Sequence, residues 1–284
     1  MNKATLVYII KTSRPRFWLY LAGPYLVGFA FGATNLNNFY SPIFILTLLY
    51  FIFPANFFLY AINDYFDQKG DMLNTKKRGR ETTFENKNKS TVFVMLGLCL
   101  FLTFLIFAVQ PNNTSRLGMI VFLLLSIFYS APPLRFKTKP FLDSSSNFLY
   151  FMPGLVGYSA VSNLTPNPTI LLCGLLWTSA MHLFSAIPDI TPDQRAGFKT
   201  TAVLLGQKYS LILVFLLWLG FWIITASLAL WFPIKIAAMV YPAIPLYILA
   251  NPKVSIERIY WFFPKINALG GFLLFWSVFI RFLF

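Results

Sequence analysis

Long uncharged runs are the feature that most restricts the fold of this 284-residue chain. Nine runs approach the length of about 20 residues that a helix needs to cross a bilayer core of roughly 30 Å. Inside lipid, backbone polar groups must be paired within the spanning structure, and the length of these runs favours helices over strands. The sequence therefore predicts an all-α, polytopic membrane protein with nine transmembrane helices, over residues 17–33, 41–62, 91–109, 117–130, 147–161, 169–188, 210–232, 236–250 and 266–284.

The composition excludes most soluble classes. Hydrophobic residues make up 57% of the chain and charged residues only 11%, whereas a soluble domain carries about 25% charged residues. The net charge of +14 would suggest nucleic-acid binding in a soluble protein, but here the basic residues share the chain with membrane-length apolar runs. We therefore expect a lipid bilayer as partner and no nucleic acid.

The charged residues alternate between the connections of the nine runs. Of the 23 Lys and Arg residues, 20 fall on one side, and only Arg116, Lys235 and Arg281 fall on the other. Because basic loops stay in the cytoplasm, the N-terminus and the basic loops are predicted to be cytoplasmic. All nine acidic residues fall on the same predicted side, which orientation does not explain because acids contribute little to topology.

A group of acids closes the second run in the pattern N-D-x-x-D-x-x-x-D. Asp64, Asp67 and Asp71 are spaced i, i+3 and i+7, which places them on one face of a helix, and Asn63 lies four residues before Asp67. Like charges in this arrangement repel each other, and desolvation at a membrane boundary adds to that unfavourable energy. A bound divalent cation would reverse the sign of the interaction.

A second acidic pair, Asp189 and Asp193, follows the sixth run at spacing i, i+4. Mg²⁺ prefers oxygen ligands and typically takes one or two carboxylates together with substrate phosphates. The two clusters therefore predict a site for Mg²⁺ and a phosphate or diphosphate. Calcium and protons are the alternative ligands, but no cage of six to eight oxygens is visible, and the neighbouring Lys and Arg residues favour an anion.

Taken in order, these motifs resemble the UbiA superfamily of intramembrane prenyltransferases. The segment from Tyr129 to Lys137 looks like the Tyr-Ser…Pro…Lys segment of that family, and Gly197 to Thr201 resembles the stretch after its second Asp motif. The resemblance covers nearly the whole chain. It implies one domain over residues 1–284, a helical bundle with a central cavity and a cap of cytoplasmic loops, and a prokaryotic cell membrane as location.

The resemblance also implies a reaction and a set of site residues. Family members use Mg²⁺ to transfer a prenyl group from an allylic diphosphate to a lipophilic acceptor. By position, the residues that would hold the Mg²⁺-diphosphate are Asn63, Asp67, Asp71, Asp189 and Asp193.

Further roles follow from the same resemblance. Lys137 and Arg135 would contact the leaving diphosphate, and Tyr129 would lie beside the reacting carbon. Arg14 and Lys199 join the expected substrate-binding residues, with an interfacial anchor as the alternative role of Arg14. Asp64 matches the motif and is expected in substrate binding, with a structural role as its alternative.

The resemblance also bears on the identity of the molecule that accepts the prenyl group. Residues 13–18 and 73–77 look most like the branch that contains lycopene elongases, which favours a carotenoid such as lycopene. Residues 78–81 lack the Pro that quinone-forming members often have, which weakens a hydroxybenzoate or naphthoate acceptor without excluding it. A transporter of an anionic lipid or metabolite is a competing class, disfavoured because the acids lie at one membrane face and not at the midplane. A non-catalytic prenyl-lipid binding protein is a third.

Overall fold

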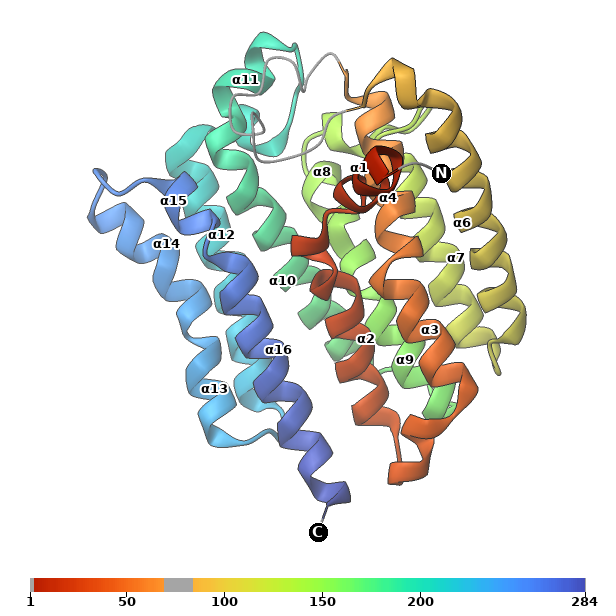
Figure 1. Cartoon of the computed structure of the whole chain (residues 1–284). Coiled ribbons are helices and arrows are strands. Elements are labelled where there is room, and N and C mark those ends of the chain that lie inside the picture. The colour runs from red at the N-terminus through yellow and green to blue at the C-terminus, as the bar shows by residue number, and fades with distance from the viewer. Residues whose placement is uncertain (1–2, 69–83, 284) are drawn as a thin grey trace. The chain divides into compact units, whose positions relative to one another are not determined.

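A computed structural model describes residues 3–68 and 84–283 of the chain (Figure 1). Within these ranges every regular element is a helix and there is no strand, which confirms the all-α prediction. The chain forms two compact units. The first unit comprises Met1–Arg135 with Met152–Thr165, and the second comprises Phe136–Phe151 with Pro166–Phe284.

The first unit contains the helices α1 (Lys3–Thr12), α2 (Leu19–Gly32), α3 (Pro42–Ile52), α4 (Pro54–Phe66), α6 (Lys89–Val109), α7 (Asn113–Phe128) and α9 (Met152–Ser162). The run over residues 41–62, expected as one helix, consists of α3 and α4 end to end. Pro54 begins α4 and has no backbone N–H to continue the hydrogen-bond ladder of α3, so the regular helix is interrupted at Phe53. The break lets α4 carry the first Asp motif at its C-terminal end.

Helices α2 and α9 pack through glycines. A Cβ atom built on Gly28 would lie 2.0 Å from the carbonyl oxygen of Gly154, and one built on Gly157 would lie 2.6 Å from the carbonyl oxygen of Tyr25. Small residues let membrane helices approach until their backbones touch, and van der Waals packing then stabilises the pair. Gly154 and Gly157 of α9 therefore allow its backbone to approach that of α2.

Gly28→Ala is expected to destabilise the protein by at least about 1–3 kcal/mol, because the added methyl group must displace backbone atoms of α9. The thermal unfolding midpoint in detergent measures the effect. Gly23→Ala is the matched control on the same helix, since a Cβ atom there meets nothing within 4 Å. Equal midpoints for the two variants would contradict the packing argument.

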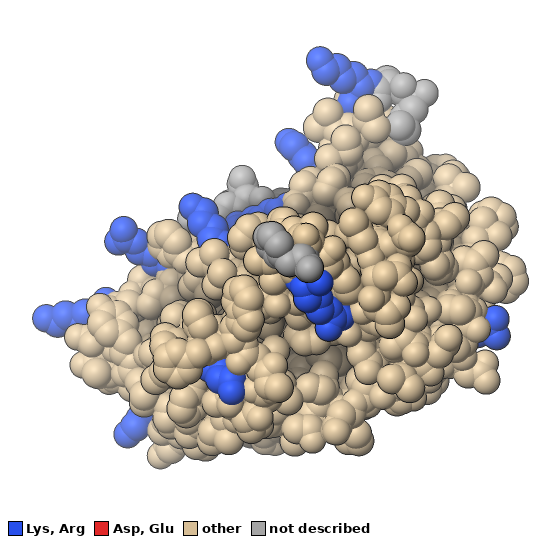
Figure 2. All heavy atoms as spheres, turned by 90° about the horizontal axis from the view of Figure 1, so that it is seen from below, with Lys and Arg blue, Asp and Glu red and all other residues tan. Residues whose placement is uncertain are grey.

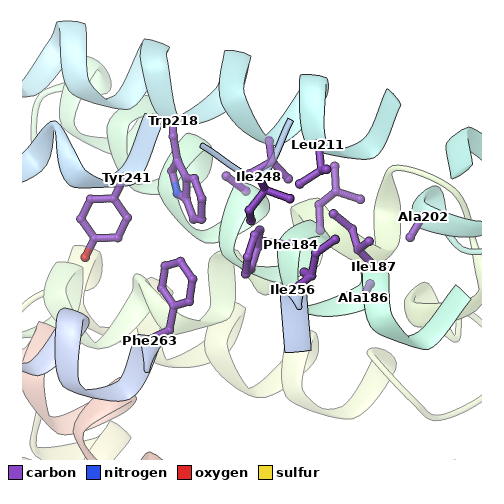
Figure 3. Close-up of a cluster of buried hydrophobic side chains, with 13 residues drawn as sticks. Phe184, Ala186, Ile187, Ala202, Leu211, Trp218, Tyr241, Ile248, Ile256 and Phe263 are labelled. Atoms are coloured by element: carbon purple, nitrogen blue, oxygen red, sulfur yellow. The ribbon is translucent and has the colours of Figure 1, made fainter. Parts of the chain in front are cut away.

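The second unit contains the helices α8 (Leu142–Ser145), α10 (Pro168–Ala186), α11 (Ile190–Arg195), α12 (Thr201–Ser227), α13 (Phe232–Ala238), α14 (Val240–Ala250), α15 (Ile256–Tyr260) and α16 (Phe263–Phe279). Its core is a cluster of buried hydrophobic side chains that includes Trp218 of α12 (Figure 3). The rings of Phe263 and Phe184 have centroids 5.5 and 5.8 Å from that of Trp218, within the usual range for favourable aromatic pairs. The cluster holds α10, α12 and α16 together.

Six helical segments of the described chain are long and apolar enough to cross a membrane. They are Pro42–Phe66, Asn86–Val109, Pro168–Arg195, Thr201–Ser227, Phe232–Ala250 and Ile256–Phe282. Three further expected runs correspond to the shorter helices α2, α7 and α9. The protein is therefore a multi-pass membrane protein, while the count of nine spans, the orientation and the central cavity stay predictions.

The surfaces of these helices agree with a lipid environment. In the apolar window of Asn86–Val109 only 17% of the residues are buried inside the protein, so most of its Leu, Phe and Val side chains point outward. Large apolar side chains exposed along a whole helix are typical of contact with lipid. Figure 2, seen from below the view of Figure 1, shows a face with scattered Lys and Arg side chains and no visible Asp or Glu among the described residues.

Candidate active site

The first Asp motif lies at the C-terminal end of α4. The helix ends at Phe66, and Asp67 is the cap residue, with its N–H donating to the carbonyl oxygen of Asn63 at 3.0 Å. Asp67 is only 5% exposed, so its carboxylate is buried. Asn63 and Asp67 thus lie one turn apart, as their spacing predicts. Asp71 lies outside the described residues, as do residues 73–77 and 78–81.

Asn63 is oriented by the end of α7. Its Nδ2 donates a hydrogen bond of 2.9 Å to Oγ of the buried Ser130, which leaves the amide oxygen Oδ1 outside this bond. Ser130 follows Tyr129, the C-terminal cap residue of α7. The Tyr-Ser segment therefore contacts the first Asp motif through Ser130, for which we predicted no role.

Arg135 lies against the same helix end. Its Nη2 donates to the carbonyl oxygen of Phe66 at 3.3 Å and lies 4.0 Å from Oδ1 of Asp67. A cation at a helix C-terminus is favourable because the carbonyl groups there carry partial negative charge. The backbone of Arg135 has a positive φ of 44°, a conformation that costs energy and persists only where the surroundings hold it. The structure thus brings together Asn63, Asp67 and Arg135.

Asp64 forms a buried ion pair with Arg14. Nη2 of Arg14 donates to its Oδ1 at 2.6 Å, and the two side chains are only 11% and 3% exposed. The Arg14 guanidinium also lies over the ring of Tyr60, with its carbon 4.5 Å from the ring centroid, which adds a cation–π attraction. Sequence analysis missed this pair because its members are 50 residues apart.

These contacts correct one step of the sequence argument. The sequence suggests that a divalent cation relieves the repulsion among the acids of the first motif. In the structure, Arg14 and Arg135 bring positive charge to Asp64 and Asp67. The repulsion between these two acids therefore does not by itself demand a cation. The role of Asp64 in substrate binding stays a prediction, and its observed partner supports the structural alternative.

The second Asp motif lies in the second unit, where α10 gives way to a 3-10 turn and then to α11. Asp189 ends the turn Ile187–Asp189 and is the N-cap residue of α11, and Asp193 lies in the first turn of that helix. Pro192 causes no break, because backbone N–H groups in a first helical turn have no partner within the helix. Two acids at a helix N-terminus are stabilised by the helix dipole.

Two lysines accompany the second motif. Nζ of Lys137 lies 5.4 Å from the centroid of the Phe198 ring, and the N–H of Phe198 donates to the carbonyl oxygen of Asp193 at 2.9 Å. Lys137 is therefore close to the segment that follows the second Asp motif. Lys199, also expected to bind substrate, is exposed.

The donor atoms fit a metal that is shared with a phosphate-bearing substrate. Among residues 3–68 and 84–283, no group of three or more His, Cys, Asp or Glu side chains could hold a metal ion. A cage made of protein alone is therefore absent from these ranges. Mg²⁺ needs only one or two carboxylates when phosphates and water complete its shell. The amide oxygen of Asn63 with Asp67, and the pair Asp189 and Asp193, offer oxygen donors of this kind.

Comparison with known proteins gives the family. The model of the UbiA prenyltransferase family matches residues 21–263. The chain belongs to the UbiA prenyltransferase family. A lycopene elongase/hydratase from Haloarcula japonica is 40% identical over 274 residues, which cover 95% of this chain and 90% of the relative. A lycopene elongase/hydratase from Haloferax volcanii is 42% identical over 274 residues, covering 95% and 87%.

Other members of the family are less similar in sequence. A 4-hydroxybenzoate octaprenyltransferase from Polynucleobacter asymbioticus is 28% identical over 223 residues, covering 75% of each chain. The structure of a UbiA homolog from Archaeoglobus fulgidus bound to DMAPP and Mg²⁺ superposes with a TM-score of 0.72 and 24% identity, covering 96% of this chain and 99% of that one. This likeness confirms the UbiA fold. As a member of the family, the protein is a prenyltransferase enzyme.

Proposed function

We propose that this UbiA-family enzyme transfers a prenyl group from an allylic prenyl diphosphate to a carotenoid such as lycopene, with Mg²⁺ and within the membrane. The observation that carries the proposal is the 40% and 42% identity to two lycopene elongase/hydratases over nearly the full length of this chain. A carotenoid is insoluble in water, so its partner enzyme must meet it in the bilayer, which agrees with the six apolar helical segments. The N-terminus and the site loops face the cytoplasm in this proposal.

In the proposed reaction the allylic carbon–oxygen bond breaks and the diphosphate leaves with the bonding electrons. The allylic cation adds to a terminal carbon–carbon double bond of the carotenoid. The new cation on the carotenoid then loses a proton or takes up water. Bound Mg²⁺ would neutralise negative charge on the leaving diphosphate.

The chain's own residues would act on the leaving group and on the cation. The Mg²⁺-diphosphate would be held by Asn63, Asp67, Asp71, Asp189 and Asp193. Lys137 and Arg135 bring positive charge to the leaving oxygen, an electrostatic contribution that is worth most where water is excluded. Tyr129 offers an aromatic face to the allylic cation, worth roughly 0.5–2 kcal/mol.

An aromatic acceptor is the second candidate. The 28% identity to a 4-hydroxybenzoate octaprenyltransferase over 75% of each chain favours it as the next substrate class to test. The lower identity and shorter coverage place it behind the carotenoid. A transporter is disfavoured by membership in a prenyltransferase family.

The acceptor is tested with purified protein in lipid vesicles that contain Mg²⁺ and dimethylallyl diphosphate or geranyl diphosphate. Lycopene, 4-hydroxybenzoate and a hydroxynaphthoate are offered in parallel, and mass spectrometry detects the prenylated product. We expect a lycopene product larger by at least one prenyl unit, together with released diphosphate, and no product in EDTA. Prenylation of an aromatic acid in place of lycopene would overturn the proposed acceptor, and turnover in EDTA would overturn the metal role.

A further inference from the structure

Asp143 is a buried carboxylate for which neither motif accounts. It is 0% exposed and lies in the second residue of the short helix α8. Its Oδ1 accepts hydrogen bonds from the N–H of Ser144 at 2.7 Å and from Oγ1 of Thr201 at 2.5 Å, and its Oδ2 accepts one from the N–H of Thr201 at 2.8 Å. Burying a carboxylate is expensive unless its oxygens are hydrogen-bonded, and these donors meet that requirement.

Thr201 is the other half of this contact. It is the first residue of α12, where backbone N–H groups have no partner within the helix, so the carboxylate of Asp143 takes the place of an intrahelical acceptor. Both its N–H and its hydroxyl donate to Asp143, which gives a two-point connection between residues 58 positions apart in the sequence. Thr201 is 1% exposed, so water does not compete for these bonds.

The same hydroxyl holds a strained piece of backbone. Oγ1 of Thr201 accepts a hydrogen bond of 2.6 Å from the N–H of Phe141, whose φ of 66° is unfavourable for a residue with a side chain. Strained residues persist where their surroundings hold them, and they concentrate at functional sites. One threonine hydroxyl therefore fixes both Asp143 and the loop that precedes it.

The two segments joined in this way each carry predicted site residues. Four residues before Phe141 lies Lys137, and the segment that leads into Thr201 carries Asp193 and Phe198. Within this unit, Lys137 also lies over the ring of Phe198. The Asp143–Thr201 contact is thus a buried, two-point hydrogen-bonded connection between the segment that carries Lys137 and the segment that follows the second Asp motif.

We propose that Asp143 and Thr201 form a clamp that positions Lys137 relative to Asp189 and Asp193 for binding of the metal-diphosphate group. Both clamp residues are positioning residues and touch no substrate. The inference rests on the proposed use of an allylic diphosphate, but it does not depend on the identity of the acceptor. It predicts that a change in a buried threonine hydroxyl weakens diphosphate binding selectively.

Three variants of the full-length protein test the clamp. Thr201→Val keeps the shape of the side chain and removes the hydroxyl, while Thr201→Ser keeps the hydroxyl. Thr225→Val is the matched control, because Thr225 is buried on the same helix and its hydroxyl donates within the helix to the carbonyl oxygen of Phe221. Binding of inorganic pyrophosphate in the presence of Mg²⁺ is measured by calorimetry in detergent, together with the KM of the allylic donor and of lycopene.

We expect Thr201→Val to raise the Kd of pyrophosphate and the KM of the donor about tenfold, equivalent to about 1.4 kcal/mol, with the KM of lycopene unchanged. Thr201→Ser and Thr225→Val are expected to stay within about twofold of the natural protein. A pyrophosphate Kd for Thr201→Val equal to that of Thr225→Val would overturn the proposal. So would an equal rise in both KM values, because a general loss of structure does not discriminate between substrates.

A second variant covers the case in which Thr201→Val does not fold. Asp143→Asn is close in shape, but its Nδ2 would face a donor of Thr201, so the same selective loss is expected. Failure of both variants to fold would overturn the positioning role, since the clamp would then be required for folding alone. Absence of turnover in the natural protein, with its pyrophosphate binding intact and sensitive to Thr201→Val, would count against the proposed function and leave the clamp supported.

Discussion

Asp67→Asn is expected to lower turnover by about 100-fold or more and to leave the fold intact, in line with the loss of one key electrostatic group from an active site. The substitution keeps the shape of a side chain that is 5% exposed and removes its charge beside Arg135. A metal ion held by a diphosphate and only a few protein carboxylates loses a large part of its binding energy when one of those carboxylates becomes neutral. The kcat for diphosphate release and the thermal midpoint are measured together.

Glu85→Gln is the control for this experiment. Glu85 is an exposed acid that forms an ion pair with Lys87, so its neutralisation removes the same charge from the protein without touching the Asp motifs. Asp189→Asn is expected to match Asp67→Asn, because the proposed function assigns both Asp motifs to one metal-diphosphate group. Turnover retained in both Asp variants, with Glu85→Gln as reference, would show that the assignment of the site is wrong.

Asp64→Ala is expected to destabilise the protein by about 3–5 kcal/mol, because it leaves the Arg14 guanidinium buried without its carboxylate. The pair is well suited to this test, since its side chains are 11% and 3% exposed and the nitrogen–oxygen distance is 2.6 Å. The free energy of unfolding is measured by titration with a denaturing detergent. A variant as stable as the natural protein would contradict a structural role for the pair.

The double variant Arg14→Met with Asp64→Leu separates stability from catalysis. Replacing a buried ion pair by apolar residues of similar volume is often neutral or stabilising, so we expect most of the lost stability to return. If Arg14 also contacts the diphosphate, the stable double variant still loses donor affinity. A stable double variant with unchanged donor KM would restrict Arg14 and Asp64 to the fold.

Local patterns in the sequence were sufficient to predict the helical class and the relative positions of Asn63 and Asp67 in the candidate site. The length of the apolar runs predicted an all-α membrane protein, because inside lipid the polar groups of the backbone must be paired within the spanning structure. The spacing of Asn63 and Asp67 predicted their positions one turn apart. Each of these inferences depends on residues that are near one another in the chain.

The helix break at Phe53 is a feature that the hydrophobic pattern did not predict. The run over residues 41–62 is uniformly apolar, so hydropathy alone predicted one helix. Pro54 interrupts the ladder but still begins a new helix, because its missing N–H is not required in a first turn. Pro54 therefore marks a junction between two helices that the hydrophobic pattern does not show.

The pairing of charges was decided by the tertiary structure. The sequence alone was enough to predict a membrane-spanning helical chain with two acidic motifs and to suggest its family. It did not determine that Arg14 lies against Asp64, or that Asp143 lies against Thr201, because these pairs are 50 and 58 residues apart and each needs several helices to be packed first. A buried charge takes whichever partner the folded chain brings within hydrogen-bond distance, since leaving it alone is too costly in energy. For that reason the sequence predicted acids for the candidate site, whereas the fold decided that Arg14 pairs with Asp64 and that Arg135 lies near Asp67. The fold also decided that Thr201 contacts Asp143, which lies outside both motifs.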